Sequence, residues 1–262
     1  MSVLSYLESL AGDALHLPSE KKKVQDAVLK LQERLTRHFG KELEQHFKFG
    51  SSVRGTNLPQ QYAEDMDIDY LVVFRERGLA PKTLLRKLVD FAQKHYRQNE
   101  VFQSSPAVVV AMSSVRFELV PARRTLTGLF HSHEIPNARA TDWVGTNPRG
   151  FERALIERNK ECHSRLKVAI RLVKMWNAGN GYVFSSFRLE NIAIDLSYPW
   201  DKNLKDYFCR LLSELPESEL DAAWRVERLG RGKNLLADAL RLEESGEVAN
   251  AYKVLDRLFG NE

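Results

Sequence analysis

The chain has 262 residues, 43% of them hydrophobic, which is enough for a substantial core and excludes a globally disordered protein. A formal net charge of +4 is only a mild excess, and it excludes the strongly basic footprint of a dedicated DNA-binding protein. No apolar run is long enough to span a bilayer, no signal peptide is recognisable, and the two cysteines lack a Cys-x-x-Cys pattern, so we expect a cytoplasmic protein with free thiols.

The predicted elements of the first half are both helices and strands. Apolar residues at helical spacing predict an amphipathic helix from about Glu20 to His38, followed by a strand near Phe47. Residues 68–74 are nearly all apolar, which predicts a central strand covered on both faces. Similar patterns predict a helix over residues 81–96 and a hairpin of two strands over residues 107–112 and 115–120.

After Pro148 only helical periodicity remains. A long helix carries Leu166 and Trp176 on one face, and a helical tail over residues 234–258 is interrupted at Ser245 and Gly246. We therefore predict an α+β protein of two domains. Residues 1–150 would form an N-terminal helix and a sheet lobe, and residues 151–262 an α-helical lobe.

The most informative stretch combines a Gly-Ser turn with two carboxylates at i and i+2. Gly50 has no Cβ and lets the backbone approach a phosphate, and Ser51 adds a hydroxyl donor. Asp67 and Asp69 point to the same face of a strand, because strand side chains alternate. A Gly-Ser turn alone binds no ligand about as often as it binds one. Its spacing from a carboxylate pair here predicts a phosphate site beside a Mg²⁺ site.

A third carboxylate has a matching context. In the run Val115 to Pro121, Phe117 lies on one face with its apolar neighbours, so Glu118 lies on the opposite face with Arg116. If this strand lies beside the first, Glu118 joins Asp67 and Asp69 around two metals roughly 3.5–4 Å apart. One metal would lower the pKa of an attacking hydroxyl, and the other would brace a triphosphate. Asp65, two residues before Asp67, is a lesser metal candidate.

Gly-Ser, Gly-Thr and Asp-x-Asp followed by a distal acidic strand resemble the polymerase β-like nucleotidyltransferase superfamily. Further stretches resemble one branch of it, the bacterial cGAS-like (DncV-like, SMODS) nucleotidyltransferases, and they cover residues 117–122, 135–148, 171–177, 185–190 and 249–260. The resemblance extends over nearly the whole chain in order. It implies a polymerase β-like lobe with a mixed sheet and flanking helices, a C-terminal α-helical lobe, and an active-site cleft between them.

The resemblance also implies roles for single residues. Asp67, Asp69 and Glu118 would be the catalytic and metal-binding carboxylates, although Glu118 replaces a more frequent Asp.

Gly50, Ser51, Lys174 and Ser185 would bind the nucleotide. Lys174 matches a position that contacts the triphosphate in related enzymes, whereas a stripe with Lys167 and Arg171 is by itself more typical of a solvated face. Ser186 is an alternative to Ser185.

The implied reaction is the Mg²⁺-dependent joining of nucleoside triphosphates, ATP or others, into a cyclic di- or trinucleotide signal with release of pyrophosphate. Mn²⁺ is an alternative metal. The product would act in bacterial antiphage defence through a downstream effector that binds it, and neither a membrane nor dedicated nucleic-acid binding is expected. Two alternatives stay open: a nucleotidyltransferase acting on tRNA or protein, and a non-catalytic nucleotide-binding regulator. A basic RNA-binding extension would favour the first, and a missing carboxylate the second.

Overall fold

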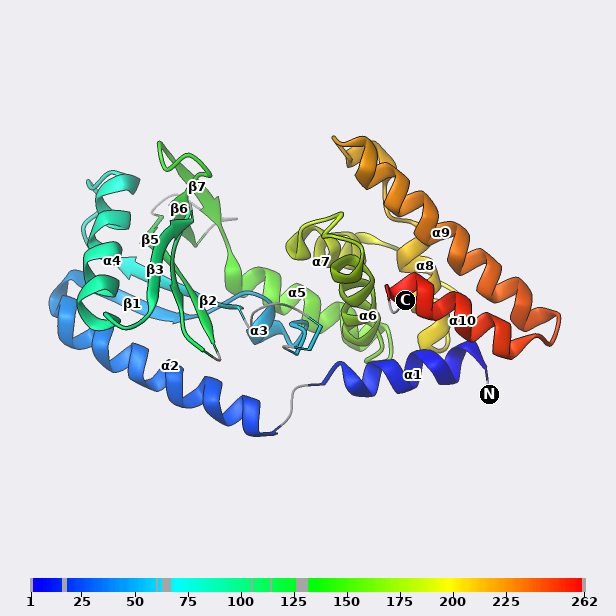
Figure 1. The fold of residues 1–262 in the computed structure, drawn as a ribbon. Helices are drawn as coiled ribbons and strands as arrows, with labels where there is room; N and C mark the ends of the chain where they lie inside the picture. Colours follow the sequence, from blue (N-terminus) through cyan, green and yellow to red (C-terminus); the bar gives the residue numbers. More distant parts are fainter. Residues whose placement is uncertain are drawn as a thin grey trace. The chain divides into compact units, whose positions relative to one another are not determined.

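The computed structural model describes residues 2–15, 18–59, 61–62, 67–104, 106–113, 115–125 and 132–260. The chain divides into two compact units, which we describe separately (Figure 1). The sheet unit comprises Leu17–Gly55 and Asp65–Arg153. The helical unit comprises Met1–His16, Thr56–Glu64 and Ala154–Glu262.

The sheet unit contains a mixed sheet that has seven strands among the described residues. Five strands lie in the order β1-β2-β5-β4-β3, while β6 pairs with β5 and β7 pairs with β6. The pair β2 and β5 is parallel, and the other pairs are antiparallel. The strands are β1 (Leu43–Lys48), β2 (Asp67–Phe74), β3 (Glu100–Ser104), β4 (Ala107–Ala111), β5 (Arg116–Arg124), β6 (His133–Pro136) and β7 (Trp143–Thr146).

Helices α2 (Pro18–Phe39) and α4 (Pro81–His95) cover one face of this sheet (Figure 1). The alternate residues Ile68 and Tyr70 of β2, with Phe117 of β5, are buried in that cluster. Residues of β2 and β5 that point the other way form a smaller apolar cluster on the opposite face, with Leu71, Val73, Val120 and Ala122 as members. The prediction that the 68–74 strand is covered on both faces is therefore confirmed, and the acidic residues Asp69 and Glu118 belong to the less covered face.

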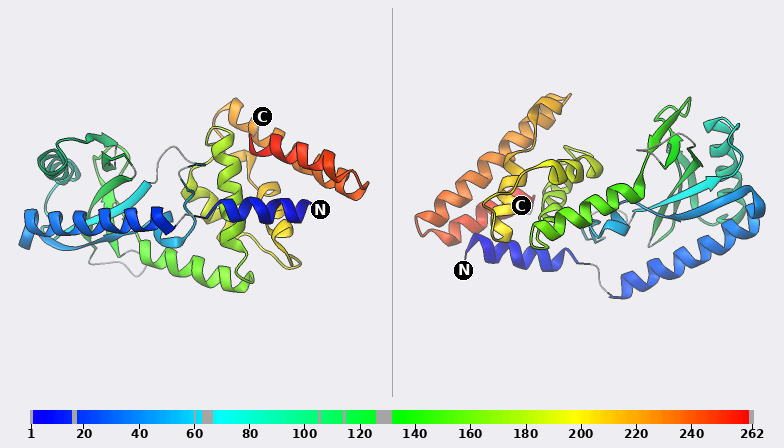
Figure 2. Two further views of the ribbon diagram at one scale, coloured as in Figure 1. Left: turned by 60° about the horizontal axis from the view of Figure 1, so that its bottom comes forward. Right: turned by 180° about the vertical axis from the view of Figure 1, so that it is seen from behind.

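The helical unit has one large core around the fully buried Trp176. Figure 2 shows α9 and α10 side by side, and the break between them falls at Ser245 and Gly246, as the sequence predicts. The helices of this unit are α1 (Val3–Asp13), α5 (Pro148–Glu161), which begins in the sheet unit, α6 (Leu166–Gly179), α7 (Ser186–Asp195), α8 (Leu204–Ser213), α9 (Ala223–Glu244) and α10 (Val248–Phe259). The short α3 (Ser51–Arg54) belongs to the sheet unit, and two 3₁₀ turns occupy Gly40–Glu42 and Glu217–Glu219.

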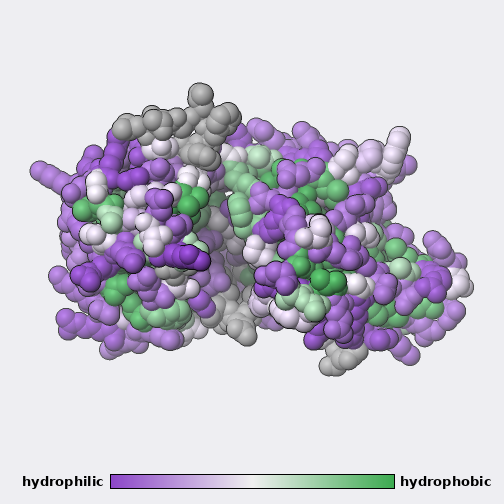
Figure 3. Space-filling view, turned by 90° about the horizontal axis from the view of Figure 1, so that it is seen from above, coloured by the Kyte–Doolittle hydropathy of each residue, from purple (hydrophilic) through white to green (hydrophobic). Residues whose placement is uncertain are grey.

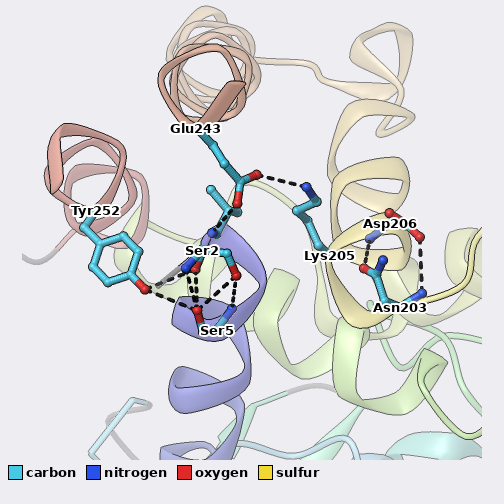
Figure 4. A network of polar contacts seen from close by, with 8 residues as sticks. Ser2, Ser5, Asn203, Lys205, Asp206, Glu243 and Tyr252 are labelled. Atoms are coloured by element: carbon cyan, nitrogen blue, oxygen red, sulfur yellow. Dashed lines mark hydrogen bonds and ion pairs between the residues drawn. The ribbon is translucent and has the colours of Figure 1, made fainter. Parts of the chain in front are cut away.

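Helix α1 differs from the predicted division of the chain, which placed all of residues 1–150 in one domain. Ser2 caps α1 in a capping box with Ser5, and the Val3 N–H donates to Glu243 of α9 at 2.6 Å (Figure 4). Lys205 of α8 binds the same glutamate at 2.9 Å, and the Tyr252 hydroxyl of α10 donates to the Ser2 carbonyl at 3.1 Å. Helices α9 and α10 thus bind the start of α1 directly, and Lys205 of α8 holds Glu243 in place. The apolar residues of α1 belong to the core of the helical unit.

The surface is mostly polar in both units. Figure 3 shows hydrophilic residues over most of one face, with hydrophobic groups interspersed, which agrees with 28% charged residues. Among the described residues, no helix is long and apolar enough to cross a membrane. Cys162 is buried, Cys209 is half-buried, and neither forms a disulfide.

Candidate active site

The parallel pairing of β2 and β5 brings the predicted carboxylates onto neighbouring strands. Asp69 and Glu118 are register partners, and Asp67 is the partner of Arg116. Because the pairing is parallel and in register, residues 67, 69, 116 and 118 share one face of the sheet. The Asp67 side chain is 51% exposed and that of Glu118 is 30% exposed, so both are open to a ligand.

Gly50 lies directly against Asp69. Its backbone has φ 77° and ψ −163°, a conformation that residues other than glycine rarely adopt. A Cβ at Gly50 would lie 1.8 Å from Asp69 Oδ2, and the neighbouring Phe49 N–H donates to the Asp69 carbonyl at 3.0 Å. The Gly50 carbonyl in turn accepts from the N–H groups of Val53 and Arg54 and starts α3 at Ser51. Glycine is needed at position 50 both for its backbone conformation and for the close approach to the Asp69 side chain.

Arg116 lies between two of the carboxylates. Its Nε is 3.4 Å from Asp67 Oδ1, and a terminal guanidinium nitrogen is 3.8 Å from Glu118 Oε1. The guanidinium also lies 5.6 Å from the centre of the Phe102 ring. The sequence pattern places Arg116 on this face but gives it no role, although a cation two residues before an acid on the same strand face indicates a contact between the two.

The donor set fits a divalent metal in chemistry and in backbone register, because carboxylate oxygens are the ligands that Mg²⁺ prefers. Among the residues that the structure describes, no three acidic, His or Cys side chains are already gathered tightly enough to enclose a metal ion. Arg116 supplies the counter-charge in this arrangement. Metal binding by Asp67, Asp69 and Glu118 stays a prediction, and Asp65 lies outside the described residues.

A cavity of about 160 Å³ opens beside the Gly-Ser turn, lined in part by Gly50 and Phe47. Its lining includes the cations Lys48, Arg54 and Arg149, against one acid, Glu152. Arg149 stacks on Phe47 at 4.9 Å, and the buried Arg54 stacks on Phe151 at 5.0 Å. The excess of positive charge makes this side of the turn favourable for an anion.

Lys174 lies in a buried ion pair within the helical unit and not on a solvated helix face. Its Nζ is 2.6 Å from Glu190 Oε1, and the two side chains are only 4% and 0% exposed. The Thr56 hydroxyl donates to the same oxygen at 2.5 Å. Arg171, one turn earlier, is half-buried, and burial lowers its pKa. The interpretation of Lys167, Arg171 and Lys174 as a solvated helix face is therefore wrong for Lys174. The contact of Lys174 with phosphate stays a prediction.

Glu190 was not predicted from the sequence as the partner of Lys174. The available signal was a glutamate among the apolar residues Leu189, Ile192 and Ala193, which places a carboxylate on the buried side of α7.

Ser185 caps the start of α7. Its side chain accepts a hydrogen bond from the Arg188 N–H at 3.2 Å, while Ser186 is the first helical residue. The preceding turn is fixed by Asn177, whose amide exchanges two hydrogen bonds of 2.9 Å with the backbone of Phe184. Ser185 is thus an exposed hydroxyl at a well-defined helix start, and its contact with phosphate stays a prediction.

Comparisons with known proteins agree with this fold. The family profile of the Second Messenger Oligonucleotide or Dinucleotide Synthetase domain, SMODS, matches residues 1–159. A probable cyclic nucleotide synthase of Bacillus cereus (strain VD146) is 25% identical over 135 residues. That match covers 48% of this chain and 41% of the relative, so less than half of the relative's length is represented.

Solved structures of similar fold cover almost the whole chain. CdnC of E. coli MS115-1, solved with ATP, has a TM-score of 0.72 at 17% identity and covers 98% of this chain and 97% of its own. CdnG of Bradyrhizobium diazoefficiens, a CD-NTase solved with GTP, has a TM-score of 0.69 at 16% identity and covers 95% and 98%. At such identities the likeness shows the fold, and the family profile, which matches more than half of the chain, shows the membership. The chain belongs to the SMODS family, the bacterial cGAS-like nucleotidyltransferases that its motifs resemble.

Proposed function

We propose that this protein is a Mg²⁺-dependent nucleotidyltransferase that joins nucleoside triphosphates into a cyclic di- or trinucleotide and releases pyrophosphate. The observation that carries the proposal is the register pairing of Asp69 with Glu118 on parallel strands, with the Gly50 backbone against Asp69. Family membership supports the reaction class.

The residues take roles that follow from their chemistry. Asp67, Asp69 and Glu118 would hold the divalent ion, Mg²⁺ or Mn²⁺, which when bound supplies Lewis acidity and charge neutralisation. Glu118 would also accept the proton of the attacking ribose hydroxyl, since it lies beside Asp69 and is partly exposed. Catalysis of phosphoryl transfer depends mainly on such positioning and on electrostatic stabilisation.

The Gly50 backbone and the Ser51 hydroxyl would bind phosphate at the start of α3. Lys174 of α6 and Ser185 at the cap of α7 are proposed as nucleotide-binding residues because they match the motifs of the family. Such contacts keep reacting groups in place and lower the entropic barrier to reaction.

Substrates and partners follow from the relatives. Solved relatives contain GTP or ATP, which supports nucleoside triphosphates as substrates. One relative, CdnC of E. coli MS115-1, was solved in complex with a HORMA protein. For this chain we propose a downstream effector that binds the cyclic product, and a role in bacterial antiphage defence.

The test is incubation of the purified chain with four labelled nucleoside triphosphates and Mg²⁺ or Mn²⁺, followed by mass spectrometry of phosphatase-resistant products. A cyclic oligonucleotide mass supports the proposal. Label transferred to added tRNA or to protein would replace it with the polymer-modifying alternative. Binding of nucleotide without turnover under either metal would favour a regulator.

A further inference from the structure

Thr56 and Glu190, which are buried together with Lys174, have no role in the chemistry described so far. Glu190 Oε1 accepts from Lys174 Nζ at 2.6 Å and from the Thr56 hydroxyl at 2.5 Å, and the Lys174 to Thr56 distance is 3.5 Å. All three side chains belong to the helical unit and are less than a tenth exposed. One carboxylate oxygen thus organises two donors that come from distant parts of the sequence.

We infer that Glu190 and Thr56 are positioning residues that fix Lys174 for contact with the triphosphate, an inference that rests on the proposed function. A lysine ammonium is a compact charge on a flexible four-carbon stem, so by itself it holds no defined position. The fully buried carboxylate of Glu190, 2.6 Å away, gives the Lys174 ammonium a defined position, because moving the ammonium away would leave the buried charge of Glu190 uncompensated.

Thr56 adds a link to the Gly-Ser turn. It follows Ser51 by five residues, and α3 and the left-handed Gly55 lie between them. The chain passes from the sheet unit into the helical unit between Gly55 and Thr56. The Thr56 hydroxyl and the Lys174 ammonium therefore share one anchor, the Glu190 carboxylate, within the helical unit.

The decisive variant is Glu190→Gln, which keeps the shape of the side chain and removes its charge. We expect the affinity for a non-hydrolysable ATP or GTP analogue to fall about 10-fold, which corresponds to about 1.4 kcal/mol. KM should rise more than kcat falls, because a phosphate contact made equally in the ground and transition states is uniform binding.

A double-mutant cycle separates positioning from other roles. Lys174→Ala alone should weaken analogue binding at least as much as Glu190→Gln. If Glu190 acts through Lys174, adding Glu190→Gln to Lys174→Ala should cause no further loss, because the two residues act as one unit. Thr56→Val, which removes only the hydroxyl, should weaken analogue binding by a smaller factor through the same route.

Matched controls address stability. Asp201 is a comparable carboxylate of the helical unit, with a side chain 4% exposed and 2.6 Å from Arg210 Nε. Asp201→Asn should lower the melting temperature without changing analogue affinity. If Glu190→Gln does not fold, the double variant Lys174→Met with Glu190→Met replaces the pair by apolar groups of similar volume, and it should stay folded with the affinity of Lys174→Ala.

Three results would overturn the inference. The first is that the Glu190→Gln variant, like the Asp201→Asn variant, has a lower melting temperature but an unchanged affinity for the analogue. The second is full additivity of Glu190→Gln and Lys174→Ala. The third is a Lys174→Ala variant that binds the analogue as well as the wild type. Failure of this inference can be distinguished from failure of the proposed function. If the wild type binds the analogue but makes no product, the proposed function fails, and the double-mutant cycle of analogue affinities can still be measured.

Discussion

Replacement of Gly50 by alanine tests the geometry at the centre of the candidate site. At φ 77° and ψ −163°, a residue with a Cβ carries a backbone cost of about 1–3 kcal/mol. The added Cβ would also lie 1.8 Å from Asp69 Oδ2 and 2.9 Å from Asp69 Cβ. The second contact cannot be relieved by rotating the carboxylate, because the Cβ of Asp69 is fixed by its backbone. The turn or strand β2 must therefore shift.

Gly55→Ala is the matched control. Gly55 also has a positive φ, 72°, but a Cβ there meets nothing within 4 Å among the described residues. It should cost about 1–2 kcal/mol of unfolding free energy and leave most of the activity. Gly50→Ala should cost more and should lower turnover by about 10²-fold, the usual effect of an error of about 1 Å at a reacting centre. Denaturant titration and product assays measure both quantities. Equal losses in the two variants would refute the close approach of Gly50 to Asp69.

Three further predictions concern the sheet unit. Arg116→Gln should tighten Mg²⁺ or Mn²⁺ binding by roughly 2- to 10-fold in calorimetry without nucleotide, because exposed ion pairs contribute about 0.2–1 kcal/mol each; weaker binding would contradict the competition between Arg116 and the metal. Glu118→Gln should lower turnover by about 10²-fold at unchanged melting temperature, and unchanged turnover with lower stability would make Glu118 a structural residue. The free energy of unfolding should decline as the pH falls below about 6.5. Burial lowers the pKa of four histidines in the folded protein, so the unfolded chain binds more protons at low pH. A higher urea midpoint at pH 5.5 than at pH 7.5 would contradict this prediction. These histidines are His38, His46, His95 and His133.

The sheet strands that carry the acids were predictable because their information is local. Alternation in residues 115–121 places Phe117 in the core and Glu118 opposite, and the structure has them so. Strands β6 and β7 were not predicted, since each has only four residues and too few alternating positions to give a period. Helix α1 was not predicted, and its place in the core of the helical unit was missed because a local pattern does not say what a segment packs on.

The environment of Lys174 depends on contacts that no local pattern encodes. Lys174 and Glu190 are 16 residues apart, and Thr56 lies 118 residues from Lys174. The same holds for Gly50 and Asp69, which meet only because β1 pairs with β2. Resemblance to a family could indicate these residues, but the partners that fix them required coordinates.

The most direct test of the central claim compares the wild type with the double variant Asp67→Ala and Asp69→Ala. Both proteins are incubated with all four nucleoside triphosphates and Mg²⁺, and cyclic products are quantified by mass spectrometry alongside melting temperatures. We predict a cyclic oligonucleotide from the wild type, and none from a double variant that remains folded. Equal product from both proteins would contradict the assignment of this face of the sheet as the active site.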